Sequence, residues 1–139
     1  MPTNITKEVY ESISFEKGSS PHYDNLISNF IDQGLFINNK GETPMIKPIN
    51  DYVTFIKNNV DAGNILSLRE SEIDASISLF GNVGNIVSKY QLDFETSSGS
   101  FTKFGVNLFQ IIKQDSKWKI SSMCWDDKDD KSLFETPIK

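Results

Sequence analysis

The stretch NIVSKYQLDFETSSGSFTKFGVNLFQII, residues 85–112, consists of two strand-like segments joined by a polar turn. In the first segment, mostly apolar side chains at every second position alternate with polar ones. Successive side chains of a strand point to opposite faces of a sheet, so this alternation predicts a strand with one buried face. The turn SSGS then reverses the chain, as in an antiparallel hairpin. The predicted buried face consists of Ile86, Ser88, Tyr90, Leu92 and Phe94.

Two further strand-like segments flank this hairpin. The polar turns GNVGN, SSGS and QDSK separate four such segments within residues 66–126. Short polar turns between alternating segments predict a four-stranded antiparallel meander.

The first half of the chain is predicted to be mainly helical. Three segments place apolar residues at helical spacing, so that each forms one apolar stripe. A short early strand, LFINN at 35–39, lies between the second and the third. Because the helices precede the meander, the sequence predicts an α+β fold with helices on one face of the sheet. The helical segments are residues 6–15, 20–30 and 51–60.

Composition limits the classes of function. The chain has 139 residues, 37% of them hydrophobic, which suits a single domain over residues 1–139. Its net charge is −5, whereas binding to nucleic acid or to an anionic membrane surface calls for a basic patch. The single Cys124 and a start without the features of an export signal favour a cytoplasmic protein.

An acidic run, DDKDD at 126–130, ends the predicted sheet. It lacks the alternating oxygen ligands, the central glycine and the closing glutamate of a calcium loop. We therefore expect a solvated acidic tail, loosely attached from about residue 128 to residue 139, and no metal site. No other pattern calls for a cofactor.

The order of elements and several local segments resemble the nuclear-transport-factor-2-like, or SnoaL-like, superfamily. YESISFEKG, residues 10–18, is similar to the first-helix signature of a group of uncharacterised bacterial members. LFGNVGNIVSKY (79–90) and GVNLFQIIKQDSKWKISSMCWDD (105–127) are similar to the sheet of that group. The resemblance covers nearly the whole chain. It implies a cone-shaped domain whose three helices and curved antiparallel sheet enclose one deep pocket, and a homodimer packed sheet to sheet.

The resemblance does not select an activity, because this superfamily includes ketosteroid isomerases, polyketide cyclases, scytalone dehydratase, limonene epoxide hydrolase and many proteins that only bind. The catalytic patterns of these enzymes are incomplete here. Two residues after Arg69 stands Ser71, where the epoxide hydrolases have an aspartate. The single His22 begins a predicted helix, where we expect it to be exposed. Tyr10 is placed like an isomerase tyrosine, or is simply a core aromatic, but Asn38 stands near the expected carboxylate base.

A polar set remains on or near the predicted inner face. These residues either satisfy one another, as buried polar groups must, or line a mostly apolar pocket. The leading hypothesis is a small-molecule-binding domain without an assignable catalytic group, for a small hydrophobic ligand with a carboxylate or carbonyl. The candidate ligand-binding residues are Tyr10, Arg69, Ser71, Ser88, Tyr90 and Asn107.

Two alternatives stay open. The first is a lyase or isomerase acting on a hydrophobic carbonyl compound, which a carboxylate with a raised pKa on the pocket floor would favour. The second is a dimeric protein-interaction module, which a dry and fully filled cone would favour.

Arg69, the only arginine, is assigned by strict alternation to the same face as Ile77 and Leu79. An arginine keeps its charge when buried, so it must find acceptors or reach water. It either holds a ligand carboxylate or carbonyl at the pocket mouth, or pairs with a helix carboxylate such as Glu8 or Glu11.

The last two strands are predicted to be apolar on both faces, and the helices cover only one face. We therefore expect a homodimer through the sheet, with Phe109, Ile111, Met123 and Trp125 as candidate anchors.

Overall fold

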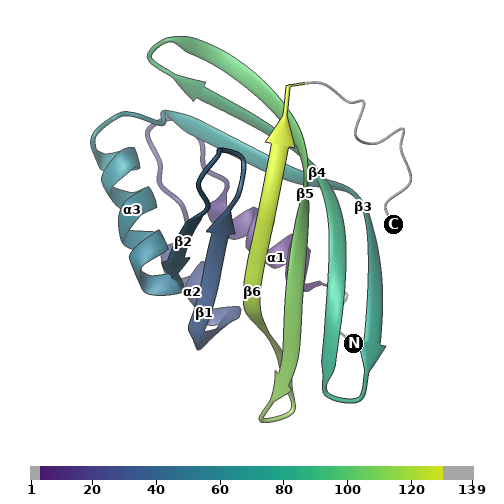
Figure 1. Ribbon diagram of the computed structural model, residues 1–139. Coiled ribbons are helices and arrows are strands. Elements are labelled where there is room, and N and C mark those ends of the chain that lie inside the picture. The colour runs from purple at the N-terminus through teal and green to yellow at the C-terminus, as the bar shows by residue number, and fades with distance from the viewer. Residues whose placement is uncertain (1–3, 130–139) are drawn as a thin grey trace.

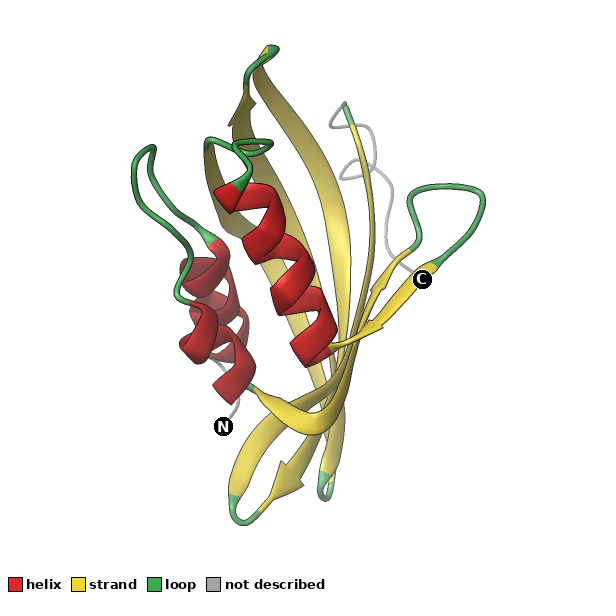
Figure 2. Ribbon diagram, turned by 90° about the vertical axis from the view of Figure 1, so that its left-hand side faces the viewer, coloured by secondary structure: helices red, strands yellow, loops and turns green. Residues whose placement is uncertain are grey.

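The computed structural model describes residues 4–129. Within this range the chain forms three helices and six strands, which confirms the expected α+β class. The helices lie against one face of a strongly curved sheet (Figure 1), and the side view shows the curvature (Figure 2). The helices are α1 (Ile5–Ile13), α2 (Tyr23–Ser28) and α3 (Ile49–Asp61), and the strands are β1 (Phe30–Asn38), β2 (Met45–Pro48), β3 (Ser67–Phe80), β4 (Val83–Thr96), β5 (Gly99–Gln114) and β6 (Lys117–Lys128).

The four C-terminal strands form the predicted antiparallel meander, and the sheet order is β2-β1-β6-β5-β4-β3. Strand β1 pairs in parallel with β6 and antiparallel with β2. The predicted strand count was wrong, because the sheet has six strands and β1 has nine residues instead of being short. Strand β2 was missed because its four residues are too few to show an alternating pattern.

The helices agree with the predicted apolar stripes in part. In α1, Val9, Tyr10 and Ile13 are buried as predicted. Helix α2 starts later and ends earlier than predicted, since the chain enters β1 at Phe30. In α3, Tyr52 is buried against the sheet.

An aromatic cluster joins α3 to the sheet. The rings of Phe36 in β1 and Tyr52 in α3 are stacked, with centroids 3.9 Å apart. The indole of Trp125 in β6 meets these two rings edge-on at 5.5 Å and 5.8 Å. Such buried aromatic contacts stabilise the contact between helix and sheet beyond simple area burial.

A β-bulge in β3 changes which side chains face the core. In the register with β4, Ile73 is an extra residue without a partner. An extra residue shifts the alternation by one, so the strand presents opposite sets of residues before and after the bulge. Before the bulge, Glu70 faces the interior, while Arg69 and Ser71 are exposed on the opposite face. The inward facing predicted for Arg69 and Ser71 was therefore wrong.

A second bulge, at Ser121, has the same effect in β6. Met123 and Trp125 consequently face the helices, and the prediction that β6 is apolar on both faces was wrong. Met123, Phe109 and Ile111 are at most 3% exposed within their own subunit. These residues are not available as dimer anchors, and Trp125 packs in the aromatic cluster. The homodimer itself stays a prediction.

Strand β6 continues into the acidic run. Asp127 is 7% exposed, so the expectation of a solvated tail was wrong for this residue. Asp126 is exposed, and Asp129 forms an ion pair with Lys103. The rest of the predicted tail, residues 130–139, lies outside the described residues. In the described part of the chain, no helix is long and apolar enough to cross a membrane.

Candidate functional site

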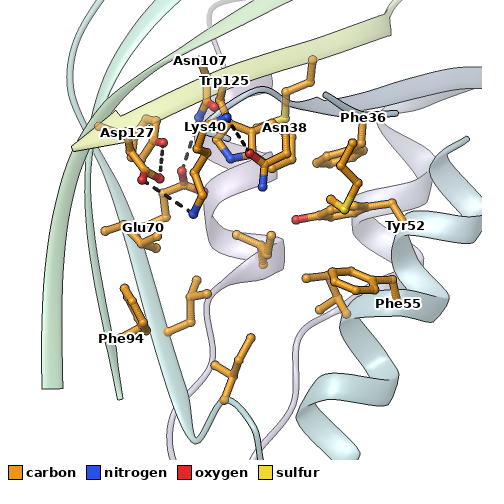
Figure 3. A pocket seen from close by; sticks show the side chains of 18 residues that line it. Phe36, Asn38, Lys40, Tyr52, Phe55, Glu70, Phe94, Asn107, Trp125 and Asp127 are labelled. Atoms are coloured by element: carbon orange, nitrogen blue, oxygen red, sulfur yellow. Dashed lines mark hydrogen bonds and ion pairs between the residues drawn. The ribbon is translucent and has the colours of Figure 1, made fainter. Parts of the chain in front are cut away.

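A cavity of about 220 Å³ lies between α3, β1 and the curved sheet. Phe36, Tyr52 and Phe55 form one wall, and Glu70 and Phe94 lie on the opposite side (Figure 3). Most of the lining is apolar, as in sites for small organic molecules. The polar lining residues are Asn38, Lys40, Glu70, Tyr90, Asn107 and Asp127.

Glu70 brings a carboxyl group to this cavity. The bulge at Ile73 turns the first half of β3 so that Glu70 points inward, where it is partly buried. Asn107 in β5 donates a hydrogen bond from its Nδ2 to Glu70 Oε2 over 3.3 Å. The carboxyl group is therefore held against the cavity from the neighbouring part of the sheet.

Burial raises the pKa of Glu70 from 4.5 to about 8. The hydrogen bond from Asn107 favours the ionised form and opposes this rise, while the negative charge of Asp127 adds to it. At pH 7 Glu70 is therefore mostly a neutral carboxylic acid that gives up its proton slightly above neutral pH.

A second carboxyl group, that of Asp127, lies at the same end of the cavity. Its Oδ2 accepts a hydrogen bond from the Tyr90 hydroxyl over 3.0 Å, and its Oδ1 lies 3.7 Å from Lys40 Nζ. Lys40 comes from the loop between β1 and β2 and is half exposed. Burial, with the charge of Asp127, raises the pKa of Tyr90, so its hydroxyl remains a proton donor.

A buried hydrogen-bond network lies behind Glu70. The Tyr10 hydroxyl and Ser88 Oγ are 2.6 Å apart, and Asn107 Nδ2 donates to the same hydroxyl over 3.0 Å. Ser88 Oγ in turn donates to Glu72 Oε2 over 2.7 Å. Glu72 is exposed, so this network connects the cavity wall to the surface. Burial raises the pKa of Tyr10 as well, and the negative charge of Glu70 raises it further.

Four of the six predicted site residues belong to this arrangement. They are at most 2% exposed, and two of them line the cavity while the other two lie behind it. Arg69 and Ser71 instead border a second, more open cavity beside α1. Arg69 is exposed and reaches water, so it is not the buried arginine that the alternation predicted. Its role as a ligand anchor stays a prediction. The residues that line the cavity are Tyr90 and Asn107, and those behind it are Tyr10 and Ser88. Their roles in ligand binding stay predictions.

Four polar residues that line the cavity were not among the predicted ligand-binding residues: Asn38, Lys40, Glu70 and Asp127. Glu70 was assigned to the wrong face because nothing in the sequence marked the bulge, and Asp127 was assigned to the solvated tail. One available signal was Gly105, a glycine inside a strand. A Cβ there would lie 2.5 Å from the Tyr90 hydroxyl, so the glycine leaves room for the contact between Tyr90 and Asp127.

No group of three or more His, Cys, Asp or Glu side chains within residues 4–129 is placed to hold a metal ion. The cysteine, Cys124, is partly buried in β6.

Several solved structures have a fold similar to that of this chain. No family profile and no curated protein sequence matches the chain. A protein from Kribbella flavida superposes with a TM-score of 0.76 at 10% identity, over 91% of this chain and 87% of that one. A nuclear-transport-factor-2-like protein of unknown function from Shewanella baltica gives a TM-score of 0.57 at 13% identity, over 91% and 90%. The chain has the nuclear-transport-factor-2-like fold.

A hexachlorocyclohexane dehydrochlorinase from Novosphingobium barchaimii is also similar, with a TM-score of 0.72 at 13% identity over 91% of this chain and 83% of that one. The fold that the resemblance implied is thereby confirmed. At these identities the likeness shows the fold alone, since one fold carries many activities. Any activity of this chain must therefore be sought in the cavity and its polar end.

Proposed function

We propose that the protein binds a small, largely apolar carbonyl compound in the cavity and that Glu70 moves a proton on it, as in an isomerase or a lyase. The observation that carries this proposal is the Glu70 carboxyl group, which lines an apolar cavity and is held there by Asn107. The leading hypothesis from the sequence, binding without catalysis, included no carboxyl group in the pocket. A carboxyl group in that position favours an isomerase or lyase over a protein that only binds its ligand.

The walls of the cavity support an apolar and cyclic ligand. Tyr52, Phe55 and Trp125 present aromatic rings to the cavity from α3 and β6. Aromatic rings pack well against flat or cyclic apolar bodies. A completely filled cone would have favoured the alternative of a dimeric protein-interaction module. The presence of the cavity is evidence against that alternative.

The chemistry follows from the two states of Glu70. Its ionised carboxylate takes a proton from the carbon next to the ligand carbonyl. The electron pair of that C–H bond forms a C=C bond, and the π pair of the carbonyl moves to its oxygen. In an isomerisation the resulting acid returns the proton to another carbon of the enolate. In an elimination the enolate re-forms the carbonyl and expels a leaving group from the β-carbon with its bonding electron pair, and Glu70 gives its proton to that group. With a pKa of about 8, Glu70 is a stronger base than an ordinary carboxylate.

Two further features fit proton transfer. Lys40 supplies positive charge at the polar end of the cavity, where negative charge develops on the carbonyl oxygen. The similar protein from Novosphingobium barchaimii is named as a dehydrochlorinase, and removal of HCl requires a base. That likeness is an analogy of fold and supports only the class of chemistry.

Deuterium exchange tests this function without knowledge of the substrate. Cyclohexanone, 1-indanone and 1-tetralone exchange the protons next to their carbonyl groups in heavy water, and proton NMR follows the loss of signal. We expect the protein to accelerate exchange for at least one ketone, with a rate that rises up to about pH 8 as Glu70 ionises. Glu70→Gln should remove about a hundredfold or more of that acceleration.

The matched control is Glu42→Gln, which makes the same change at an exposed glutamate in the loop between β1 and β2. This variant should exchange ketones like the unmodified protein. Equal exchange rates with the unmodified protein and with Glu70→Gln would show that Glu70 does not move a proton. Thermal shift with the same ketones reports binding separately, because a ligand raises the apparent stability by mass action.

A further inference from the structure

The loop between β1 and β2 places an ammonium group at the polar end of the cavity. The Nζ of Lys40 in this loop lies 3.7 Å from Asp127 Oδ1, which is longer than a hydrogen bond. The side chain of Lys40 is 42% exposed, whereas that of Asp127 is only 4% exposed. The lysine therefore reaches a buried carboxylate from the solvent side, and its contact with that carboxylate is loose.

Asp127 is held in place by groups other than Lys40. It belongs to β6, where it pairs with Gly105 of β5. Its Oδ2 accepts the hydrogen bond of the Tyr90 hydroxyl over 3.0 Å. The carboxylate thus keeps its position at the cavity when Lys40 moves away. A buried carboxylate without an opposing charge is unfavourable, so a different cation that reaches Asp127 is stabilised in the place of the lysine.

The rest of the cavity suits the body of an organic cation. Tyr52, Phe55 and Trp125 line it with aromatic rings. Tyr52 and Phe55 lie across the cavity from Asp127 (Figure 3). Aromatic rings pack against flat apolar groups, and their faces attract cations. The net charge of the chain, −5, also favours cations over anions.

We propose that the cavity binds a protonated primary amine with a flat apolar body, whose ammonium group displaces Lys40 from Asp127. The body of the amine lies against the aromatic wall, and Lys40 then lies in solvent. This binding goes beyond the proposed function, because it requires no proton transfer by Glu70. The amine occupies the same cavity as the carbonyl compound and therefore inhibits the proposed reaction.

The first experiment titrates the full chain by calorimetry with benzylamine, 2-phenylethylamine and 3-phenylpropylamine, and with the three phenyl alcohols of the same chain lengths. Each alcohol has the body of its amine but no charge. We expect at least one amine to bind roughly tenfold more tightly than its alcohol. Equal affinities within every pair, or no binding of any amine, would overturn the proposal.

The second experiment removes the negative charge that the ammonium group is expected to meet. In Asp127→Asn the amine and its alcohol should bind almost equally. The matched control is Asp126→Asn, which makes the same change at the exposed neighbouring residue and should keep the full preference for the amine. A full preference for the amine in folded Asp127→Asn would contradict the proposal.

The third experiment removes the lysine and leaves Asp127 intact. In Lys40→Met the ammonium group of the ligand no longer has to displace a lysine, so we expect the amine to bind several-fold more tightly and the alcohol to bind as before. Lys57→Met removes the same charge from an exposed position of α3 and should change the affinity for the amine by less than about twofold. An unchanged or weaker affinity in Lys40→Met would show that the amine does not take the place of Lys40.

Failure of this proposal and failure of the proposed function give different results. Calorimetry measures amine binding whether or not the protein exchanges the protons of a ketone. An absent preference for amines leaves the exchange that depends on Glu70 intact.

Discussion

The free energy of unfolding depends on whether Glu70 carries its proton. The pKa of this group is about 8 in the folded protein against 4.5 without the surrounding structure. Between these two values the folded state retains a proton that the unfolded chain has released. The contribution of Glu70 to the free energy of unfolding is therefore fully present below about pH 4.5 and is lost as the pH rises through about 8.

Glu70→Gln removes this dependence, because glutamine does not titrate. We expect the variant to gain stability relative to the unmodified protein as the pH is raised from about 5 to about 9. Urea unfolding of both proteins at the two pH values measures the difference. A difference that stays constant would mean that the pKa of Glu70 is not raised.

Two serines on neighbouring strands differ in their surroundings: Ser88 belongs to the buried hydrogen-bond network, and Ser71 lies on the exposed face. Ser88 is fully buried and accepts the hydrogen bond of Tyr10, whereas Ser71 is exposed. Ser88→Ala leaves the Tyr10 hydroxyl without its acceptor, and we expect it to lower the free energy of unfolding by about 1–3 kcal/mol. Ser71→Ala should change it by no more than about 0.5 kcal/mol. Urea unfolding compares the two, and equal losses would refute the network.

Strand β5 depends on a glycine where it passes the polar end of the cavity. A Cβ at Gly105 would lie 2.5 Å from both the Asp126 carbonyl oxygen and the Tyr90 hydroxyl. Gly105→Ala must therefore displace β6 or Tyr90, and we expect a loss of about 1–3 kcal/mol from overpacking.

Gly41→Ala is the control for this change, because a Cβ at Gly41 meets nothing within 4 Å. It should leave the melting temperature unchanged or slightly higher, since alanine restricts the unfolded chain. A melting temperature that falls equally in both variants would show that the close approach at Gly105 is not what limits this strand.

Alternation along the strands predicted the meander and the buried set of β4, because β4 has no bulge and one covered face. It did not predict the facing of Glu70, Arg69 or Trp125. A single extra residue in β3 and another in β6 invert the alternation, and neither Ile73 nor Ser121 differs in type from an ordinary strand residue. The sequence therefore placed four of the six candidate residues correctly inside, namely Tyr10, Ser88, Tyr90 and Asn107, and assigned Glu70 to the other face. Their roles in ligand binding stay predictions.

The outer face of the sheet bears on assembly. Leu108 alternates with the buried Asn107 and Phe109, so it lies on the face away from the helices, where it is 48% exposed. Phe80 and Val83, at the turn between β3 and β4, are 87% and 52% exposed. We predict a homodimer that buries this outer face. Light scattering should give twice the mass of the chain, and a monomer at micromolar concentration would contradict the prediction.

Leu108→Lys tests which surface forms such a dimer. A charge at the centre of a buried interface is unfavourable, so we expect this variant to be monomeric. Ile46→Lys, at a residue of β2 that is 58% exposed, is the control and should remain dimeric.

The curved sheet, α3 and the bulge in β3 together place the carboxyl group of Glu70 in a largely apolar cavity, and the proposed chemistry depends on its ionisation. Carbon-13 NMR of the glutamate side-chain carboxyl groups measures that ionisation, with Glu70→Gln assigning the signal. We predict that the Glu70 signal titrates with a midpoint near pH 8, in accord with the pKa that burial gives this group. A midpoint near the ordinary value of 4.5 would mean that Glu70 is a plain solvated carboxylate, and the proposed function would fall with it.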